Sequence, residues 1–208
     1  MSDSTSELIF LIKKGRAAAF ALEVQTLVEQ GETPAIEGAT FNKKTINKFH
    51  FKGIDMTNVA FEECNLSECI FEECLLEGTF FDNTSLMECA FIGCHGEGFA
   101  LDTCTIGHSS FAAMQLTAPE WSDTQFNDCA LSYITLEEPL LERLTLRNGS
   151  LEAVTCNLGE LTHVTLRDMD EPKNLELNEC VTQSCYVVGD DDVIPEGFSK
   201  KTGRRRTL

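Results

Sequence analysis

Ten cysteines give this chain its greatest potential for chemistry, as metal ligands, redox pairs or nucleophiles. Their spacing does not fit a zinc site, because no CxxC pairs of the zinc type are present. Seven cysteines instead lie at multiples of five residues from one another, namely Cys64, Cys69, Cys74, Cys89, Cys94, Cys104 and Cys129. We therefore predict reduced thiols that pack as small apolar side chains.

The other groups that could act as acids, bases or nucleophiles form no recognisable catalytic arrangement. The four histidines are scattered, and no Ser/His/Asp, HExxH or phosphate-loop pattern is found. Adjacent carboxylates such as Glu62 and Glu63 are expected on an exposed convex surface, where no cleft desolvates them to shift a pKa. The sequence predicts a protein that is not an enzyme and holds neither a metal nor a cofactor.

Acidic residues dominate the charge of the chain. The 208 residues include 34 Asp and Glu against 16 Lys and Arg, which gives a net charge of -18. Between Lys52 and Arg143, 90 consecutive residues carry 17 acids and no Lys or Arg. This balance disfavours direct contact with nucleic acid or an anionic membrane. A protein partner with a basic surface, or solubility alone, would explain it.

The N-terminal residues do not resemble a targeting segment. The longest early apolar run, residues 8–12, is too short to span a bilayer. Lys13, Lys14 and Arg16 follow this run, whereas a secretory signal has its basic residues first. We expect one soluble domain in the cytoplasm, where cysteines stay reduced.

A period of five residues organises the chain. Stepping by five from Ile36 to Leu166, 25 of 27 positions hold large apolar residues and none is charged. A helix repeats every 3.6 residues and a strand every two, so neither explains this pattern. The chain must therefore turn once every five residues. One of the two exceptions is Gly96, where we expect the ring of Phe99 to fill the gap that the missing side chain leaves in the core.

Small residues collect two places before each apolar centre, as in residues 64–68 (CNLSE) and 69–73 (CIFEE). Over residues 36–169 this sequence resembles the pentapeptide-repeat family. The resemblance implies an all-β solenoid, a right-handed quadrilateral β-helix with four pentapeptides per coil. The central and the small residue of each repeat would point inward.

Such a coil places residues 20 apart directly above one another, with strands about 4.8 Å apart. The phenylalanines Phe51, Phe71, Phe91 and Phe111 would then form one internal ladder. Stacked cysteines such as Cys69 and Cys89 would come within disulfide range. Parallel inward side chains and a reducing compartment favour free thiols instead.

The acids of the Lys-free stretch fall into outward columns with the same spacing. The candidate partner-binding columns are Glu62/Asp82/Asp102/Glu142, Glu77/Glu97/Glu137 and Glu68/Glu88/Asp128. Seventeen charges over 4.5 coils, about 22 Å of rod, give one charge per about 1.3 Å. Duplex DNA carries one per about 1.7 Å.

Three regions are expected along the chain. Residues 1–34 are rich in helix formers and predict one or two helices that cap an open solenoid end. Residues 35–188 form the β-helix, whose frame breaks at 170–172 and resumes shifted by one residue. Residues 189–208 predict a charged, flexible tail. With no apolar helix at this end, the coil edge at Val181, Val187 and Val188 is a candidate homodimer surface; the family members that dimerise use this end.

Two functions stay open. The first is a non-enzymatic scaffold for protein–protein interactions with an acidic rod surface. The second, implied by the resemblance, is a DNA mimic that binds DNA gyrase or a related topoisomerase and protects it from quinolones or peptide toxins. The uninterrupted frame over residues 36–166 and the helical N-terminus depart from the quinolone-resistance members of the family.

Overall fold

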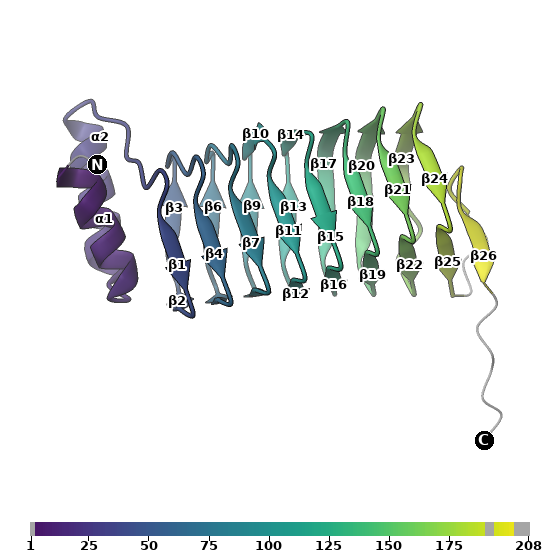
Figure 1. Ribbon diagram of the computed structural model, residues 1–208, viewed down its shortest axis with the longest axis horizontal. Coiled ribbons are helices and arrows are strands. Elements are labelled where there is room, and N and C mark those ends of the chain that lie inside the picture. The colour runs from purple at the N-terminus through teal and green to yellow at the C-terminus, as the bar shows by residue number, and fades with distance from the viewer. Residues whose placement is uncertain (1–2, 190–193, 202–208) are drawn as a thin grey trace, which may run out of the picture.

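The computed structural model describes residues 3–189 and 194–201. The chain forms a parallel β-solenoid of about 7 turns, with two helices across its N-terminal end (Figure 1). The helices are α1 (Asp3–Lys13) and α2 (Ala17–Glu29). The predicted all-β solenoid with a helical N-terminal cap is confirmed. No helix in the described ranges is long and apolar enough to cross a membrane.

Each coil has four sides, numbered here in the order in which the chain visits them. Face 1 is an 8-stranded parallel sheet of β1 (Thr40–Asn42), β4 (Ala60–Glu62), β7 (Phe80–Asp82), β11 (Ala100–Asp102), β15 (Glu120–Ser122), β18 (Leu140–Glu142), β21 (Glu160–Thr162) and β24 (Val181–Gln183). Face 2 is a 9-stranded parallel sheet of β2 (Thr45–Asn47), β5 (Asn65–Ser67), β8 (Ser85–Met87), β12 (Thr105–Gly107), β16 (Gln125–Asn127), β19 (Thr145–Arg147), β22 (Thr165–Arg167), β25 (Tyr186–Val188) and β26 (Ser199–Lys201).

Faces 3 and 4 belong to one further 9-stranded sheet, because long strands in the later coils turn the corner between them. Face 3 holds β3 (His50–Lys52), β6 (Ile70–Glu72), β9 (Ala90–Ile92) and β13 (Ser110–Ala112). Face 4 holds β10 (His95–Glu97) and β14 (Gln115–Thr117). The strands that run along both faces are β17 (Ala130–Glu137), β20 (Ser150–Asn157) and β23 (Lys173–Asn178).

One pentapeptide makes one side of the coil. Three residues form the strand, and the buried middle residue points inward. The residue after the strand takes up the left-handed conformation, with φ of 50° at Glu63 and 53° at Glu68, which turns the chain onto the next face. Neighbouring coils satisfy the backbone groups at these corners: Glu63 N donates to Asp82 O at 2.9 Å.

Phenylalanine ladders fill the N-terminal half of the solenoid. Phe71 stacks on Phe91 with ring centroids 4.4 Å apart, and Phe61 stacks on Phe81 at 4.6 Å. These rings lie in the paired middle positions of faces 3 and 1, as the 20-residue spacing predicts. The internal ladder expected from the sequence is confirmed.

Gly96 and Phe99 both depart from the repeat. A side chain at Gly96 would begin 2.7 Å from the backbone of Leu76 and Glu77, so this position brings two coils close together. The ring of Phe99 is fully buried and meets the rings of Phe81 and Trp121 edge to face. Phe99 therefore points inward, as predicted.

The small inward residues also hold the coils together by hydrogen bonds. The Thr84 hydroxyl donates to Phe61 O at 3.0 Å, and the Cys64 thiol donates to Phe41 O at 3.2 Å. All ten cysteines are free. A thiol in this position is thus a weak counterpart of the threonine hydroxyl as well as a small apolar group.

The last coil is displaced by one residue, as the shifted frame predicts. Cys156 pairs with Leu177 and Leu166 pairs with Val187, so these partners are 21 residues apart.

The interpretation of residues 189–208 as a tail is wrong for residues 198–201. Strand β26 pairs with β25, and Phe198 packs against the core. The exposed edge of β25 offers main-chain donors and acceptors, and pairing with them needs no apolar periodicity. Within the predicted tail, residues 190–193 and 202–208 lie outside the described residues.

Candidate protein-interaction surface

The first predicted acidic column lies on face 1. Parallel pairing places Glu62 beside Asp82 and Asp82 beside Asp102 in adjacent strands. The next strand contributes Ser122, and Glu142 follows it. The four acids therefore share one face, but a neutral residue separates the last acid from the first three.

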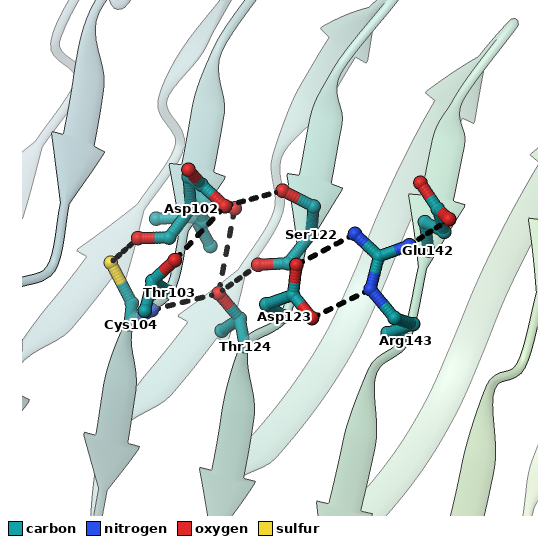
Figure 2. Close-up of polar contacts among 9 residues, drawn as sticks. Asp102, Thr103, Cys104, Ser122, Asp123, Thr124, Glu142 and Arg143 are labelled. Carbon is teal, nitrogen blue, oxygen red and sulfur yellow. Dashed lines mark hydrogen bonds and ion pairs between the residues drawn. The ribbon is translucent and has the colours of Figure 1, made fainter.

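Polar partners surround the end of this column (Figure 2). The Ser122 hydroxyl donates to Asp102 Oδ1 at 2.6 Å. Arg143 binds both carboxylate oxygens of Asp123, at 2.6 and 2.7 Å, and also contacts Glu142. The bidentate bond to the Arg143 guanidinium holds the pKa of Asp123 below its ordinary value. Arg143 thus neutralises the acidic surface at its C-terminal limit.

The other two predicted columns lie on different sides of the rod. Glu68, Glu88 and Asp128 occupy the exposed corner between faces 2 and 3, with His108 between the last two. Glu77, Glu97 and Glu137 lie on face 4, where Thr117 separates Glu97 from Glu137. Asn157 donates to Glu137 at 2.6 Å. Each column is thus interrupted by one residue that is not acidic, and the three columns do not merge into one acidic face.

Lysines of the first coil terminate the acidic surface at its N-terminal limit. Lys43 pairs with Glu63, and Lys48 pairs with Glu68, each at 3.5 Å. Lys52 and His50 both bind Glu72 at 2.7 Å. Hydrogen bonds from Lys52 and then His50 lower the pKa of Glu72. The candidate residue Glu68 therefore already has a cationic neighbour within the chain.

An uncharged surface on face 3 was missed from the sequence. On β9, β13 and the first part of β17, the outward residues are Ala90, Ile92, Gly93, Ser110, Ala112, Ala113, Ala130, Ser132 and Tyr133. Ile92 and Tyr133 are exposed, by 41% and 63%. This surface lies between the Glu68/Glu88/Asp128 corner and the Glu77/Glu97/Glu137 column. The sequence does contain a signal for this surface, because its outward positions, 20 residues apart, lack charged residues.

Only part of the candidate dimer end stays exposed. Val181 on β24 is 66% exposed, whereas Val187 is buried and Val188 is half-buried. The prediction for Val187 is wrong because it is the inward residue of β25, whose edge pairs with β26. Val181 therefore remains as the candidate contact at this end.

The thiols and carboxylates show no arrangement for catalysis or metal binding in the described part of the chain. Burial raises the pKa of the Cys104 thiol to about 11 and that of Cys156 to about 12. Such thiols stay protonated near neutral pH. Within residues 3–189 and 194–201, no group of three or more His, Cys, Asp and Glu is placed to hold a metal ion.

The five-residue geometry agrees with comparisons to known proteins. Residues 65–138 match the family model described as a pentapeptide repeat region. The chain contains a pentapeptide repeat region. Its pentapeptide-repeat solenoid extends beyond the matched residues on both sides, because the same ladders run from β1 to β22.

A solved structure shares the fold of this chain. A trypsin-treated variant of QnrB1, a plasmid-mediated fluoroquinolone resistance protein, matches with a TM-score of 0.51 and 15% identity, over 71% of this chain and 86% of that chain. Rfr23, a pentapeptide repeat protein from the cyanobacterium Cyanothece 51142, matches less closely, with a TM-score of 0.37 and 14% identity, over 77% of this chain and 98% of that chain. No curated protein sequence matches this chain.

Proposed function

We propose that this pentapeptide-repeat protein is a non-enzymatic cytoplasmic scaffold that docks a protein partner on face 3. The observation that carries the proposal is the uncharged surface of β9, β13 and β17 between two acidic columns. An apolar centre with a charged rim is the usual anatomy of a protein–protein interface. The partner would present an apolar patch bordered by Lys or Arg.

The uncharged surface on face 3 is too small to bind a partner alone, so the acidic columns beside it must also contact the partner. A strand of three residues is about 10 Å long, and the three strands β9, β13 and β17 extend about 10–15 Å along the rod. The flat uncharged surface is then about 100–150 Å², far below the roughly 800 Å² per partner of a standard interface. The partner must therefore also contact the flanking columns, including Glu88 and Glu97.

The acidic columns favour such a partner electrostatically. Like charges directly opposite one another in neighbouring coils are destabilising, as for Glu77 and Glu97 beside face 3. Basic groups on a partner would relieve this repulsion. Attraction between the two surfaces would also accelerate association at low ionic strength and weaken as salt is added.

A single arginine on face 3 tests the proposal. Ala112→Arg puts a charge and a long side chain in the centre of the uncharged surface. Gln125→Arg places the same side chain on exposed face 2 as a matched control. We expect partners captured from a lysate by the wild type and by Gln125→Arg to be lost with Ala112→Arg. Equal capture by all three proteins would overturn docking on face 3.

The second candidate is a DNA mimic that binds DNA gyrase or a related topoisomerase. The continuous ladder of Glu62, Asp82 and Asp102 favours it, because carboxylates about 4.8 Å apart form a regular line of negative charge, as the phosphates about 3.4 Å apart along one DNA strand do. Similarity in fold to a fluoroquinolone resistance protein motivates the choice of partner.

Charge reversal on face 1 separates the two candidates. Replacing Glu62, Asp82, Asp102 and Glu142 with Lys changes the net charge by eight units, while these surface sites contribute little to stability. A DNA mimic should lose affinity for purified DNA gyrase, and the salt dependence of any residual binding should flatten. A folded variant that keeps the affinity of the wild type at every salt concentration would exclude mimicry by this face. If the partner docks on face 3, the four substitutions on face 1 should leave its binding unchanged.

A further inference from the structure

The C-terminal half of the solenoid contains an axial cavity that is partly open. Its volume is about 60 Å³, and its lining is apolar. The cause is a change in the inward residues after Phe126, where leucines replace the phenylalanines of the earlier coils. The inward residues of face 1 show this change. Phe61 and Phe81 lie in the earlier coils, and Leu141 and Leu161 take the same position in the coils after Trp121.

Residual exposure of these leucines is an independent sign of the cavity. Phe61 and Phe81 are 0% exposed, whereas Leu141 is 6% and Leu146 is 7% exposed although both point into the solenoid. A well-packed interior leaves few voids larger than a water molecule. The leucine coils are therefore underpacked relative to the phenylalanine coils.

The cavity is elongated along the solenoid axis. Trp121, Leu141 and Leu161 all line it, and they occupy successive strands of face 1. Two strand spacings of about 4.8 Å make this wall about 10 Å long. The lining includes Trp121 towards the N-terminal coils and the half-buried Leu177 and Phe198 towards the C-terminal end.

The interior is suited to an apolar occupant. A buried water needs two to four polar partners. The lining includes one buried side-chain nitrogen, the indole N–H of Trp121, which donates to no acceptor in the described part of the chain. Water is therefore poorly held, and a charged group would be costly to bury.

We propose that this cavity binds the apolar end of a linear alkyl chain that enters from the C-terminal end of the rod, beside Phe198. The volume limits how much of the ligand enters, because a benzene-binding cavity measures about 150 Å³ and this one, about 60 Å³, holds only the last few carbons of a chain. The elongated lining favours a single file of methylene groups over a ring. The polar head of the molecule stays outside the last coil.

Trp121 provides the readout, because it is the single tryptophan of the chain and lines the cavity. The probe is 1-bromohexane, whose bromine quenches indole fluorescence on contact. We expect saturable quenching with one binding site per chain, and at least tenfold weaker quenching by bromobenzene. Quenching that rises linearly with 1-bromohexane shows collision without binding and overturns the proposal. Equal saturable quenching by bromobenzene overturns the linear shape of the site.

A cavity-filling variant localises the binding. Leu161→Phe puts a ring in the column where Phe61 and Phe81 already stack, so the fold should accept it. Leu158→Phe adds the same ring at a corner that is 55% exposed, as the matched control. We expect saturable quenching to fall at least tenfold in Leu161→Phe and to persist in Leu158→Phe. Unchanged quenching in Leu161→Phe, with an unchanged circular dichroism spectrum, would refute the site.

If Leu161→Phe does not fold, Leu141→Phe makes the same test one coil earlier. Loss of saturable quenching in a folded Leu141→Phe supports the cavity as the binding site. Retention in that variant excludes it.

Discussion

Individual inward residues decide how well each coil is packed. Phe99 stands where neighbouring repeats have a small residue, and its ring contacts Phe81, Phe91 and Trp121. Gly96 lets two coils approach closely, because a side chain there would begin 2.7 Å from the backbone of the preceding coil. A buried ring and a close backbone contact thus accommodate the two departures from the repeat.

Phe99→Ala should therefore be strongly destabilising. Removing a fully buried ring leaves a cavity that the stacked coils cannot close, so we expect a loss of about 3–5 kcal/mol in the free energy of unfolding. Chemical denaturation measures it, with Phe80→Ala as the control because Phe80 is 36% exposed. A loss below about 1 kcal/mol for Phe99→Ala would contradict this account.

At the same scale, Arg143 should control the titration of Asp123. The pKa of Asp123 lies below its ordinary 3.8 because the Arg143 guanidinium hydrogen-bonds the carboxylate. The unfolded chain binds this proton more readily, so the stabilisation is present above about pH 3.8 and is lost as the pH falls through the folded-state pKa. Solvent and salt screen the pair, so the effect on stability should be small.

Nuclear magnetic resonance titration of the Asp123 carboxyl carbon tests this assignment. In Arg143→Met the pKa should return towards 3.8, whereas Arg147→Met, on neighbouring face 2, should leave it low. An unchanged pKa in Arg143→Met would mean that another group holds the carboxylate charged.

At the scale of elements, the two helices close an end of the solenoid that would otherwise expose its core. Phe20 of α2 meets the rings of Phe49 and Phe51 of the first coil, with centroids 5.4 and 5.3 Å away. Leu8 and Ile12 of α1 are buried in the same cluster. The helices therefore extend the hydrophobic core as well as covering strand edges.

Disrupting this contact should make the protein self-associate. Phe20→Asp places a charge in the buried cluster, and removal of residues 1–34 uncovers the first coil altogether, so both should expose apolar surface and strand edges. Light scattering should detect aggregates in both cases. Leu22→Asp on the outer side of α2, 66% exposed, should stay monodisperse. A monomeric truncated protein with unchanged melting would instead assign the helices to a partner.

At the scale of the whole molecule, the two ends of the rod differ. The N-terminal end is covered by α1 and α2, whereas β24 at the other end pairs only with β21 among the described strands. Strand β26 covers part of that end through β25. An unpaired edge beside the exposed Val181 is a surface on which a second copy could pair isologously.

A homodimer through this end predicts that Val181→Lys lowers the measured mass to that of a monomer. Light scattering at high protein concentration tests it, with Leu158→Lys, a comparably exposed apolar residue at a corner, as the control. A wild-type monomer at high concentration would reject the dimer. A dimer that withstands Val181→Lys would place the contact elsewhere.

The sequence by itself determined every feature that repeats. A buried residue at each fifth position, such as Phe71 or Leu86, requires a turn per pentapeptide, and the acidic columns then follow from steps of 20 residues. The one-residue shift before Leu177 was visible for the same reason. These features are local, because each repeat has the same backbone geometry.

Only the tertiary structure decided what does not repeat. Strand β26 has no apolar pattern, because it is held by main-chain pairing to β25. The ion pair of Arg143 with Asp123 and the uncharged surface of face 3 depend on which corners lie side by side. The axial cavity depends on the summed volume of side chains from four faces, such as Leu141 and Leu161. Pairing, surface charge and packing volume each combine residues that lie far apart in the sequence, so no single repeat contains them.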